Sequence, residues 1–281
     1  MRIGVISDTH SNVEAFRAVA RALGDAGIAR LICAGDVIGY GPRPNETTDL
    51  LRELLARTNR AFPDPVFGHV VAGNHDRFIT GALDATWFNP AAAEALRWTR
   101  DEITDATREF LGALPDRVVI SVDERSDGAA LAIEVVHGRH DADEMTPLYT
   151  PYLQDAASAH LHLTAQTTPL SIVGHTHIAF VGVLEGGKLV TGRPAVPPGD
   201  KEMSRAELGS FSASRRVVMN PGSVGQPRDG DRRAAFAVVE SDATSVRVEF
   251  HRVAYDDRAV SNEIDSRRLP HALGARLAVG R

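Results

Sequence analysis

The chain has 281 residues, of which 43% are hydrophobic and 24% charged, so it holds enough apolar material for a core and is not a disordered chain. Its 31 basic and 37 acidic side chains give a net charge of −6, which argues against broad, non-specific binding to nucleic acids. A single cysteine, Cys33, excludes a disulfide scaffold, and no apolar run reaches the roughly 20 residues of a membrane helix, so we expect a cytoplasmic protein with no membrane partner.

Three apolar segments near the N-terminus predict the strands of a parallel sheet. They cover residues 2–6, 30–34 and 66–72, and each ends in a polar cluster. Because a helical pattern separates each pair of segments, the order strand–helix–strand–helix–strand indicates crossover connections. Ligands of such sheets bind at the carboxyl ends of the strands, which makes the polar clusters candidate site residues.

Helix-start patterns predict where the helices begin. Ser11 and Glu14 have the spacing of a capping box, so we expect Ser11 to be the N-cap of the first helix. Asn45 is expected to cap the second helix. Asn89 followed by Pro90 fits an N-cap and first-turn pair at the start of a later helical region.

From residue 117 onward the pattern changes to strands. A helix is predicted over 152–166, a loop over 194–214 and a fraying helix in the charged tail after Asp256. The predicted strands cover residues 117–122, 129–136, 170–174, 178–184, 188–192, 215–219, 234–240 and 245–254.

No linker divides the chain, so we expect a single domain over residues 1–281. Its core reaches about residue 254, and residues 255–281 form a C-terminal tail. The pattern predicts an α/β fold in which two sheets pack face to face with helices outside.

Five polar clusters lie where predicted strands end. They are Asp8-Thr9-His10, Gly35-Asp36, Gly73-Asn74-His75-Asp76, His137-Gly138 and Gly174-His175-Thr176-His177. One such cluster alone arises easily by chance, whereas five at strand ends do not. Imidazole, carboxylate and amide oxygen suit manganese, iron, zinc or nickel, and the lack of thiolate argues against a structural zinc site. The clusters therefore predict a two-metal site.

In this order the motifs D-x-H, G-D, G-N-H-D, H-G and G-H-T-H resemble those of the calcineurin-like metallophosphoesterases. The strings from Gly35 to Pro42 and from Asn220 to Asp229 resemble a bacterial, phosphodiesterase-type branch of that family. The resemblance implies a four-layer αββα sandwich of two mixed β-sheets flanked by helices.

The resemblance also implies a ligand set for two divalent transition-metal ions. Asp8, His10, Asp36 and His177 would hold one ion, and Asp36, Asn74, His137 and His175 the other, with Asp36 bridging. His75 would be the catalytic histidine that faces the substrate. The implied reaction is in-line attack of metal-bound hydroxide on phosphorus.

The second motif departs from the protein serine/threonine phosphatases of the superfamily. They continue it with an aspartate and an arginine, where this chain has Gly39 and Tyr40. Because a monoester dianion needs more positive charge than a diester, the absent arginine predicts a preference for diesters. Arg77, Tyr40 and Arg228 are the candidate substrate contacts, and Arg77, Arg139 or Arg228 would reverse the preference if it folded into the missing position.

These features favour a metal-dependent phosphoesterase, either a phosphodiesterase or a nucleotide phosphohydrolase, with a small phosphoester or nucleotide as substrate. The alternatives are a diadenosine polyphosphate hydrolase, a broad phosphomonoesterase and, from another class, an inactive binding scaffold. All eight motif residues are present, which argues against the scaffold. No stable nucleic-acid partner is expected, and the oligomeric state stays open.

The other histidines are expected to have structural or solvent roles. His69 is predicted to pack within a strand, His160 and His162 to lie on a surface, and His140 to lie in a solvated loop. The Asn220–Asp229 loop has two interpretations, a purely structural one and one that places Ser223 or Arg228 near the metals.

Overall fold

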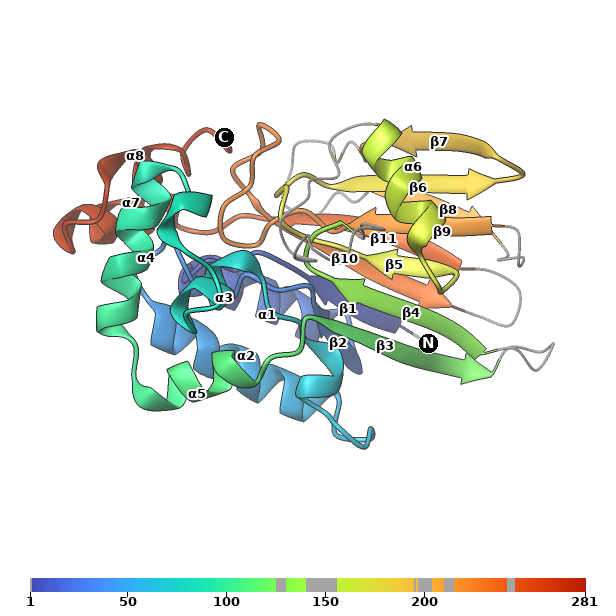
Figure 1. Cartoon of the computed structure of the whole chain (residues 1–281), viewed down its shortest axis with the longest axis horizontal. Helices are drawn as coiled ribbons and strands as arrows, with labels where there is room; N and C mark the ends of the chain where they lie inside the picture. The colour runs from blue at the N-terminus through green and yellow to red at the C-terminus, as the bar shows by residue number, and fades with distance from the viewer. Residues whose placement is uncertain are drawn as a thin grey trace.

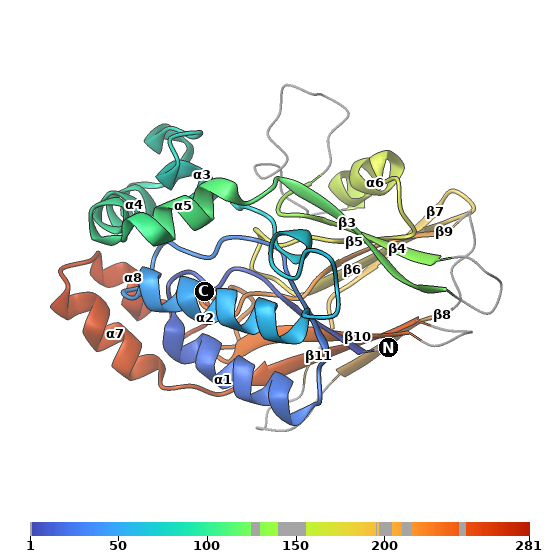
Figure 2. The same ribbon diagram turned by 90° about the horizontal axis from the view of Figure 1, so that it is seen from below.

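Two β-sheets pack face to face, and helices cover both outer faces (Figures 1 and 2). The computed structural model describes residues 2–124, 130–139, 156–194, 196, 204–209, 215–241 and 246–281. Both sheets mix parallel and antiparallel neighbours. The predicted four-layer αββα arrangement is confirmed.

The first sheet has the strand order β2-β1-β10-β11-β8. β1 and β2 run parallel, and the other neighbours run antiparallel. The strands are β1 (Arg2–Ile6), β2 (Arg30–Cys33), β8 (Ser204–Gly209), β10 (Ala234–Ser241) and β11 (Val246–Val253).

The second sheet has the strand order β3-β4-β5-β9-β6-β7. Its three central strands β4, β5 and β9 run parallel to one another. The strands are β3 (Arg117–Glu124), β4 (Ala130–Val136), β5 (Leu170–Ile172), β6 (Phe180–Glu185), β7 (Lys188–Gly192) and β9 (Arg215–Asn220).

Helices flank each sheet on one side only. α1 and α2 cover the outer face of the first sheet, and α6 covers the outer face of the second (Figure 2). The helices are α1 (Val13–Asp25), α2 (Pro44–Thr58), α3 (Asn74–Ile79), α4 (Pro90–Glu102), α5 (Asp105–Ala113), α6 (Ala156–Ala165), α7 (Asp257–Ser266) and α8 (His271–Ala275), with short 3₁₀ helices η1 (Phe67–His69) and η2 (Ala85–Trp87). No helix in the described part of the chain has both the length and the apolar composition needed to cross a membrane.

β1 shows why its sequence is apolar without interruption. Ile3 and Val5 belong to the core between the two sheets, whereas Ile6 belongs to the core between the first sheet and its helices. Side chains alternate between the two faces of a strand, and here both faces are buried. The strand is thereby fixed between helices and second sheet, and its carboxyl end carries Asp8.

Both predicted N-caps of the first two helices are wrong by one or two positions. Asn12, not Ser11, caps α1, because its side-chain oxygen accepts the N–H three residues further on (3.1 Å). α2 begins at Pro44, whose ring suits the first helical position. The Asn45 side chain instead accepts the N–H of Thr104 (2.9 Å), before α5.

The predicted third strand over residues 66–72 is also wrong. η1 occupies its first half, and in the described part of the chain its strand-like pairing with β2 is a single bridge between Cys33 and Val70. The carboxylate of Asp64 accepts the N–H of Phe67 (2.9 Å), which favours a tight turn over extended chain. The single bridge still brings the segment that follows it to the end of β2.

Part of the predicted loop over residues 194–214 is the edge strand β8, which pairs with β11. The C-terminal tail contains two packed helices instead of one that frays. Ile264 of α7 and Leu273 of α8 are both 1% exposed and pack with Tyr40 and residues of α4. The apolar residues recur at helical spacing, but the surrounding charges of the tail hide that pattern.

Replacing Ile264 by alanine tests the packed tail. A buried isoleucine lost from a core costs about 2–5 kcal/mol, so the free energy of unfolding in urea should fall by that amount. Asn262→Ala, at an exposed position of the same helix, should change it by less than about 0.5 kcal/mol. Equal small effects of both substitutions would support a fraying tail.

Candidate metal centre

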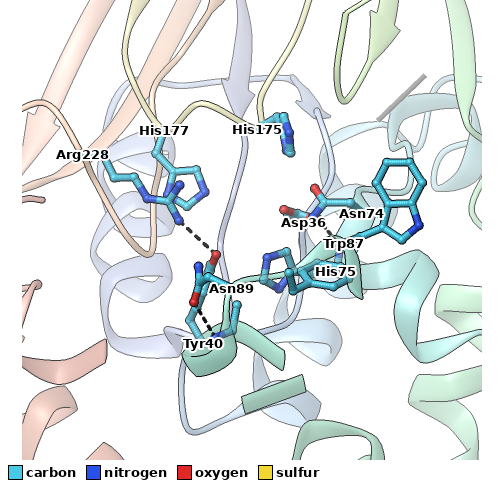
Figure 3. Close-up of a pocket in the computed structure, with 11 residues that line it drawn as sticks. Asp36, Tyr40, Asn74, His75, Trp87, Asn89, His175, His177 and Arg228 are labelled. Atoms are coloured by element: carbon cyan, nitrogen blue, oxygen red, sulfur yellow. Dashed lines mark hydrogen bonds between the residues drawn. The ribbon is translucent and has the colours of Figure 1, made fainter. Parts of the chain in front are cut away.

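The motif residues meet at the carboxyl ends of parallel strands from both sheets (Figure 3). Asp8 follows β1, Asp36 follows β2, Asn74 and His75 begin α3, His137 follows β4, and His175 and His177 follow β5. β1 and β2 run side by side in one sheet, and β4 and β5 in the other. Their ends therefore form one edge where four motifs converge.

The potential ligand atoms form two groups that share Asp36. The first group is Asp8, His10, Asp36 and His177, and the second is Asp36, His137 and His175. Within each group the ligand atoms lie within 4.8 Å of one another. Asn74, also predicted as a ligand, lies beside these groups, and its buried side-chain oxygen has no hydrogen-bond partner in the part of the chain that the structure describes.

Backbone carbonyls orient three of the imidazole rings. In each ring Nδ1 lies within hydrogen-bond distance of a carbonyl oxygen, in the pairs His10–Ile38 (3.0 Å), His137–Ala34 (2.6 Å) and His177–Gln226 (2.6 Å). A carbonyl only accepts, so Nδ1 is the donor, and in the neutral ring Nε2 keeps its lone pair. The three rings thus present Nε2, the form in which a histidine binds a metal.

This arrangement of lone pairs fits a cation. The Nε2 atoms of His10 and His177 lie 2.9 Å apart, and burial lowers the pKa of both rings, so a proton does not readily fill the gap. Asp8 Oδ2 is buried with no hydrogen-bond partner among the described residues, and His137 Nε2 lies 3.2 Å from Asp36 Oδ2. Burial also raises the pKa of the Asp8 carboxyl to about 7, as expected for a carboxylate without its counter-charge. Divalent transition metals suit this donor set.

The backbone at the site is held in an uncommon conformation. Asp8, His10, Asp36, His175 and His177 all have positive φ, between 47° and 68°. Each such residue costs about 1–3 kcal/mol and persists only where its surroundings hold it. Hydrogen bonds between the loops do so: Asp8 Oδ1 accepts the N–H of His175 (3.1 Å), and Asp36 Oδ1 accepts that of His75 (2.9 Å).

Asp76 joins the second and third motifs. Its buried carboxylate accepts the N–H groups of Gly73 (2.9 Å), Val37 (3.0 Å) and Ile38 (3.2 Å). It therefore fixes the loop that carries Asp36 against the start of α3. The sequence singled out Asp76 only as part of a motif, so this positioning role was not predicted.

His75 has no carboxylate behind it. Its Nδ1 is buried without a hydrogen-bond partner among the described residues. The backbone of Gly39 packs directly against this nitrogen. A Cβ at Gly39 would overlap that nitrogen, and φ there is +99°, so only glycine fits. Burial lowers the pKa of His75 to about 4, which leaves its ring neutral near pH 7.

The Asn220–Asp229 loop supports the first ligand group. The Ser223 hydroxyl donates to the Asp8 carbonyl (2.8 Å), and the Gln226 carbonyl accepts from His177. The Asn220 side chain donates to the Gly174 carbonyl (2.6 Å), just before His175. The sequence analysis quoted Asn220 and Gln226 only as part of the Asn220–Asp229 segment. Contacts made to or through backbone carbonyls depend on the fold and cannot be recognised from residue type.

The site opens into a cavity of about 270 Å³ (Figure 3). Beside the candidate ligands and His75, it is lined by Tyr40, Trp87, Phe88, Asn89, Ala92 and Arg228. The Arg228 guanidinium donates to the Tyr40 hydroxyl and to Gln226 Oε1, each at 3.0 Å. The loop thus serves both interpretations left open by the sequence, since it supports ligands and brings Arg228 to the cavity.

Arg77, which the sequence offered as a substrate contact, is not among the residues that line the cavity. Its guanidinium donates to Asp116 (2.7 Å) and to the Leu114 carbonyl (2.6 Å). It lies in α3 directly after the motif, but the helix turns its side chain toward the segment before β3. Nearness in sequence was therefore a poor guide to nearness in space.

The remaining histidines behave mostly as predicted. His69 is buried and pairs with the Nε of Arg30 (2.9 Å). His160 is exposed, but His162 is fully buried against the Ser171 hydroxyl (2.9 Å), so the surface prediction for it is wrong. His140 lies outside the described residues.

Comparisons with known proteins agree over nearly the whole chain. A family model, the calcineurin-like phosphoesterase superfamily domain, matches residues 1–244. The uncharacterized protein MJ0912 of Methanocaldococcus jannaschii is 32% identical over 279 residues, 99% of this chain and 98% of that protein.

Two solved structures share the fold. A metallophosphoesterase from Sphaerobacter thermophilus is 35% identical with a TM-score of 0.73, and the match covers 100% of both chains. The hypothetical protein PH1004 from Pyrococcus horikoshii OT3 is 19% identical with a TM-score of 0.70, covering 100% of this chain and 98% of that one.

Asp76→Asn should weaken metal binding without touching a ligand. The new amide would bring a donor toward backbone N–H groups, and loss of such supporting contacts typically costs about 10–100-fold in metal affinity. Titration calorimetry with Mn²⁺ measures the effect. Asp49→Asn, at an exposed position of α2, is the matched control. Unchanged affinity in the Asp76 variant would contradict its positioning role.

Proposed function

The chain belongs to the calcineurin-like phosphoesterase superfamily, as its motifs predicted, and we propose that it hydrolyses small phosphoesters or nucleotides at a centre of two divalent metal ions. The observation that carries the proposal is the pair of ligand groups that share Asp36. Lone pairs already face one another across these groups, an arrangement that two cations would stabilise. All eight motif residues are in place, which argues against an inactive scaffold.

The ligand assignment follows the two groups. Asp8, His10, Asp36 and His177 would hold the first ion, and Asp36, Asn74, His137 and His175 the second. When bound, such ions would lower the pKa of a water molecule and stabilise negative charge on the phosphoryl oxygens. Mn²⁺, Fe²⁺, Zn²⁺ and Ni²⁺ all suit these ligands.

The chain's own residues would orient the substrate and manage the proton. In the hydrolysis a bond forms between water oxygen and phosphorus, the ester P–O bond breaks, and the leaving oxygen takes up a proton. His75 lines the cavity, is 3% exposed and belongs to neither ligand group. Its ring is held between those of His10 (4.7 Å) and Phe88 (5.0 Å), so it would meet the substrate in a fixed orientation. We assign it the role of hydrogen-bonding the leaving oxygen or the phosphoryl group.

Arg228 changes the expected substrate charge. The sequence argument for diesters assumed that position 40 carries no cation, yet the guanidinium of Arg228 lies at the Tyr40 hydroxyl. The loop is anchored there, because Asp229 pairs with the largely buried Arg252. A guanidinium forms forked hydrogen bonds with phosphate oxygens, so it would supply the charge that a monoester dianion needs. Phosphomonoesters therefore join diesters as proposed substrates.

Elemental analysis and kinetics of two variants test the metal centre together. After saturation with Mn²⁺ and desalting, the wild-type protein should retain about two equivalents per chain. His75→Ala should retain them and lose about 10²–10⁴-fold in turnover, because it removes proton-transfer help but no ligand. Asp36→Ala should lose metal, since its shared carboxylate has no substitute. A stoichiometry of one in the wild type, or metal loss in the His75 variant, would contradict the assignment.

Arg228→Gln tests the substrate charge. The kcat/KM for p-nitrophenyl phosphate should fall about 10–100-fold, since hydrogen bonds to charged groups contribute about 1.5–3 kcal/mol. The kcat/KM for bis-p-nitrophenyl phosphate should fall less, because the diester carries one charge fewer. Arg77→Gln is the control, as its guanidinium is bound to Asp116 away from the cavity. If both substrates lose equally, Arg228 does not read the second charge.

A further inference from the structure

A tryptophan lies exposed on the wall of the cavity. Trp87 is 56% exposed, and of the six large apolar side chains exposed in the described part of the chain, it is the one that lines this cavity. Figure 3 shows its indole and Arg228 on opposite sides of Asp36 and His175. The cavity thus has a cationic end and an aromatic end, with the candidate metal ligands between them.

The segment that carries Trp87 is fixed before any ligand arrives. Trp87 ends η2, whose first turn is capped by Asp84, and Asn89 caps α4 directly afterwards, as predicted. Between them, Phe88 packs edge-on against His75, with ring centroids 5.0 Å apart. The indole therefore projects from a short segment held at both ends, which lowers the entropy cost of binding against it.

The chemistry of the two ends points to one kind of substrate. The carboxylates and imidazoles suit metal ions and Arg228 suits a phosphoryl group, but none of them recognises the organic part of an ester. An indole presents a flat apolar face on which a nucleobase stacks, and such stacking accepts any base because every base has a π-face. A cavity of about 270 Å³ matches one small ligand, not a polymer.

We propose that Trp87 stacks on the nucleobase of a nucleotide substrate while its phosphate lies between Arg228 and the metal ligands. This inference rests on the proposed phosphoesterase function and narrows it from small phosphoesters in general to nucleoside phosphates. Trp87 would then set specificity through binding, and the hydrolysed P–O bond would be the same as in any other substrate of the site.

Kinetics with two monoesters of equal charge provide the first test. The Mn²⁺-loaded protein is assayed with AMP and with glycerol 2-phosphate, which lacks an aromatic ring. Trp87→Ala should lower the ratio of their kcat/KM values about 10–100-fold, mainly through the KM for AMP, and Trp87→Phe should recover most of the ratio. Val190→Ala, an exposed position on β7, should leave both activities unchanged. An unaltered ratio in Trp87→Ala would overturn the proposal.

Fluorescence separates this inference from the function itself. The chain has two tryptophans, so Trp98→Phe leaves Trp87 as the one tryptophan, which is excited at a wavelength that the four tyrosines do not absorb. Saturable quenching of the metal-loaded variant by AMP, and none by glycerol 2-phosphate, supports stacking even if no hydrolysis occurs. Hydrolysis of glycerol 2-phosphate together with no quenching by AMP would keep the phosphoesterase function and reject the nucleobase site.

Discussion

The arrangement of the loops at the candidate site depends on the buried cluster of acceptor atoms around Asp36. Two carboxylates and four imidazoles lie within a few ångströms, and Asp8, Asp36 and His137 are almost wholly removed from water. Taking such groups out of water is costly unless charges of opposite sign or donors replace it. Within the described residues, the backbone N–H groups of His175 and His75 donate to the two carboxylates from the outward side of the cluster. The inward side is left for cations, so metal binding and folding stability are linked at this point.

The fold meets that constraint by using the ends of parallel strands from two sheets. Neither sheet alone holds a complete ligand group: Asp8, His10 and Asp36 follow strands of the first, and His137, His175 and His177 follow strands of the second. Five of the six residues in the two ligand groups, all except His137, have left-handed backbone. Backbone hydrogen bonds between the motif loops offset the strain. A ligand set of this kind is therefore as much a product of the packing between the sheets as of its own side chains.

The sequence predicted which residues gather at the candidate site better than it predicted the elements around them. Asp36 and His175 could be identified because a polar cluster after an apolar run depends on local pattern, and parallel strands bring their ends together. The prediction of a third strand was wrong because the Asp64 carboxylate accepts the N–H of Phe67 and holds this segment in a turn, which the apolar pattern does not reveal. Of the two arginines proposed as substrate contacts, Arg228 lines the cavity and Arg77 does not. Arg77 follows the motif directly, but its side chain points away, whereas the loop with Arg228 folds back from far along the chain. His162 and the tail were misjudged because their packing partners lie on other elements: Ser171 is on β5, and Tyr40 is far from the tail along the chain.

The pairing of β1 with β10 has a consequence for the order in which the protein matures. Arg2 lies opposite Glu240, and Asp8 is supported by Ser223, so the first motif is completed by residues synthesised more than two hundred positions later. Contacts of such long sequence separation form slowly, because a long loop must close first. For most of its synthesis, a growing polypeptide on the ribosome would contain Asp8 and His10 but not yet β10, one of the two strands that pair with β1. We therefore expect metal to bind late, after β10 and the Asn220–Asp229 loop have emerged. Before that point, the exposed histidines of the nascent chain could bind a wrong ion.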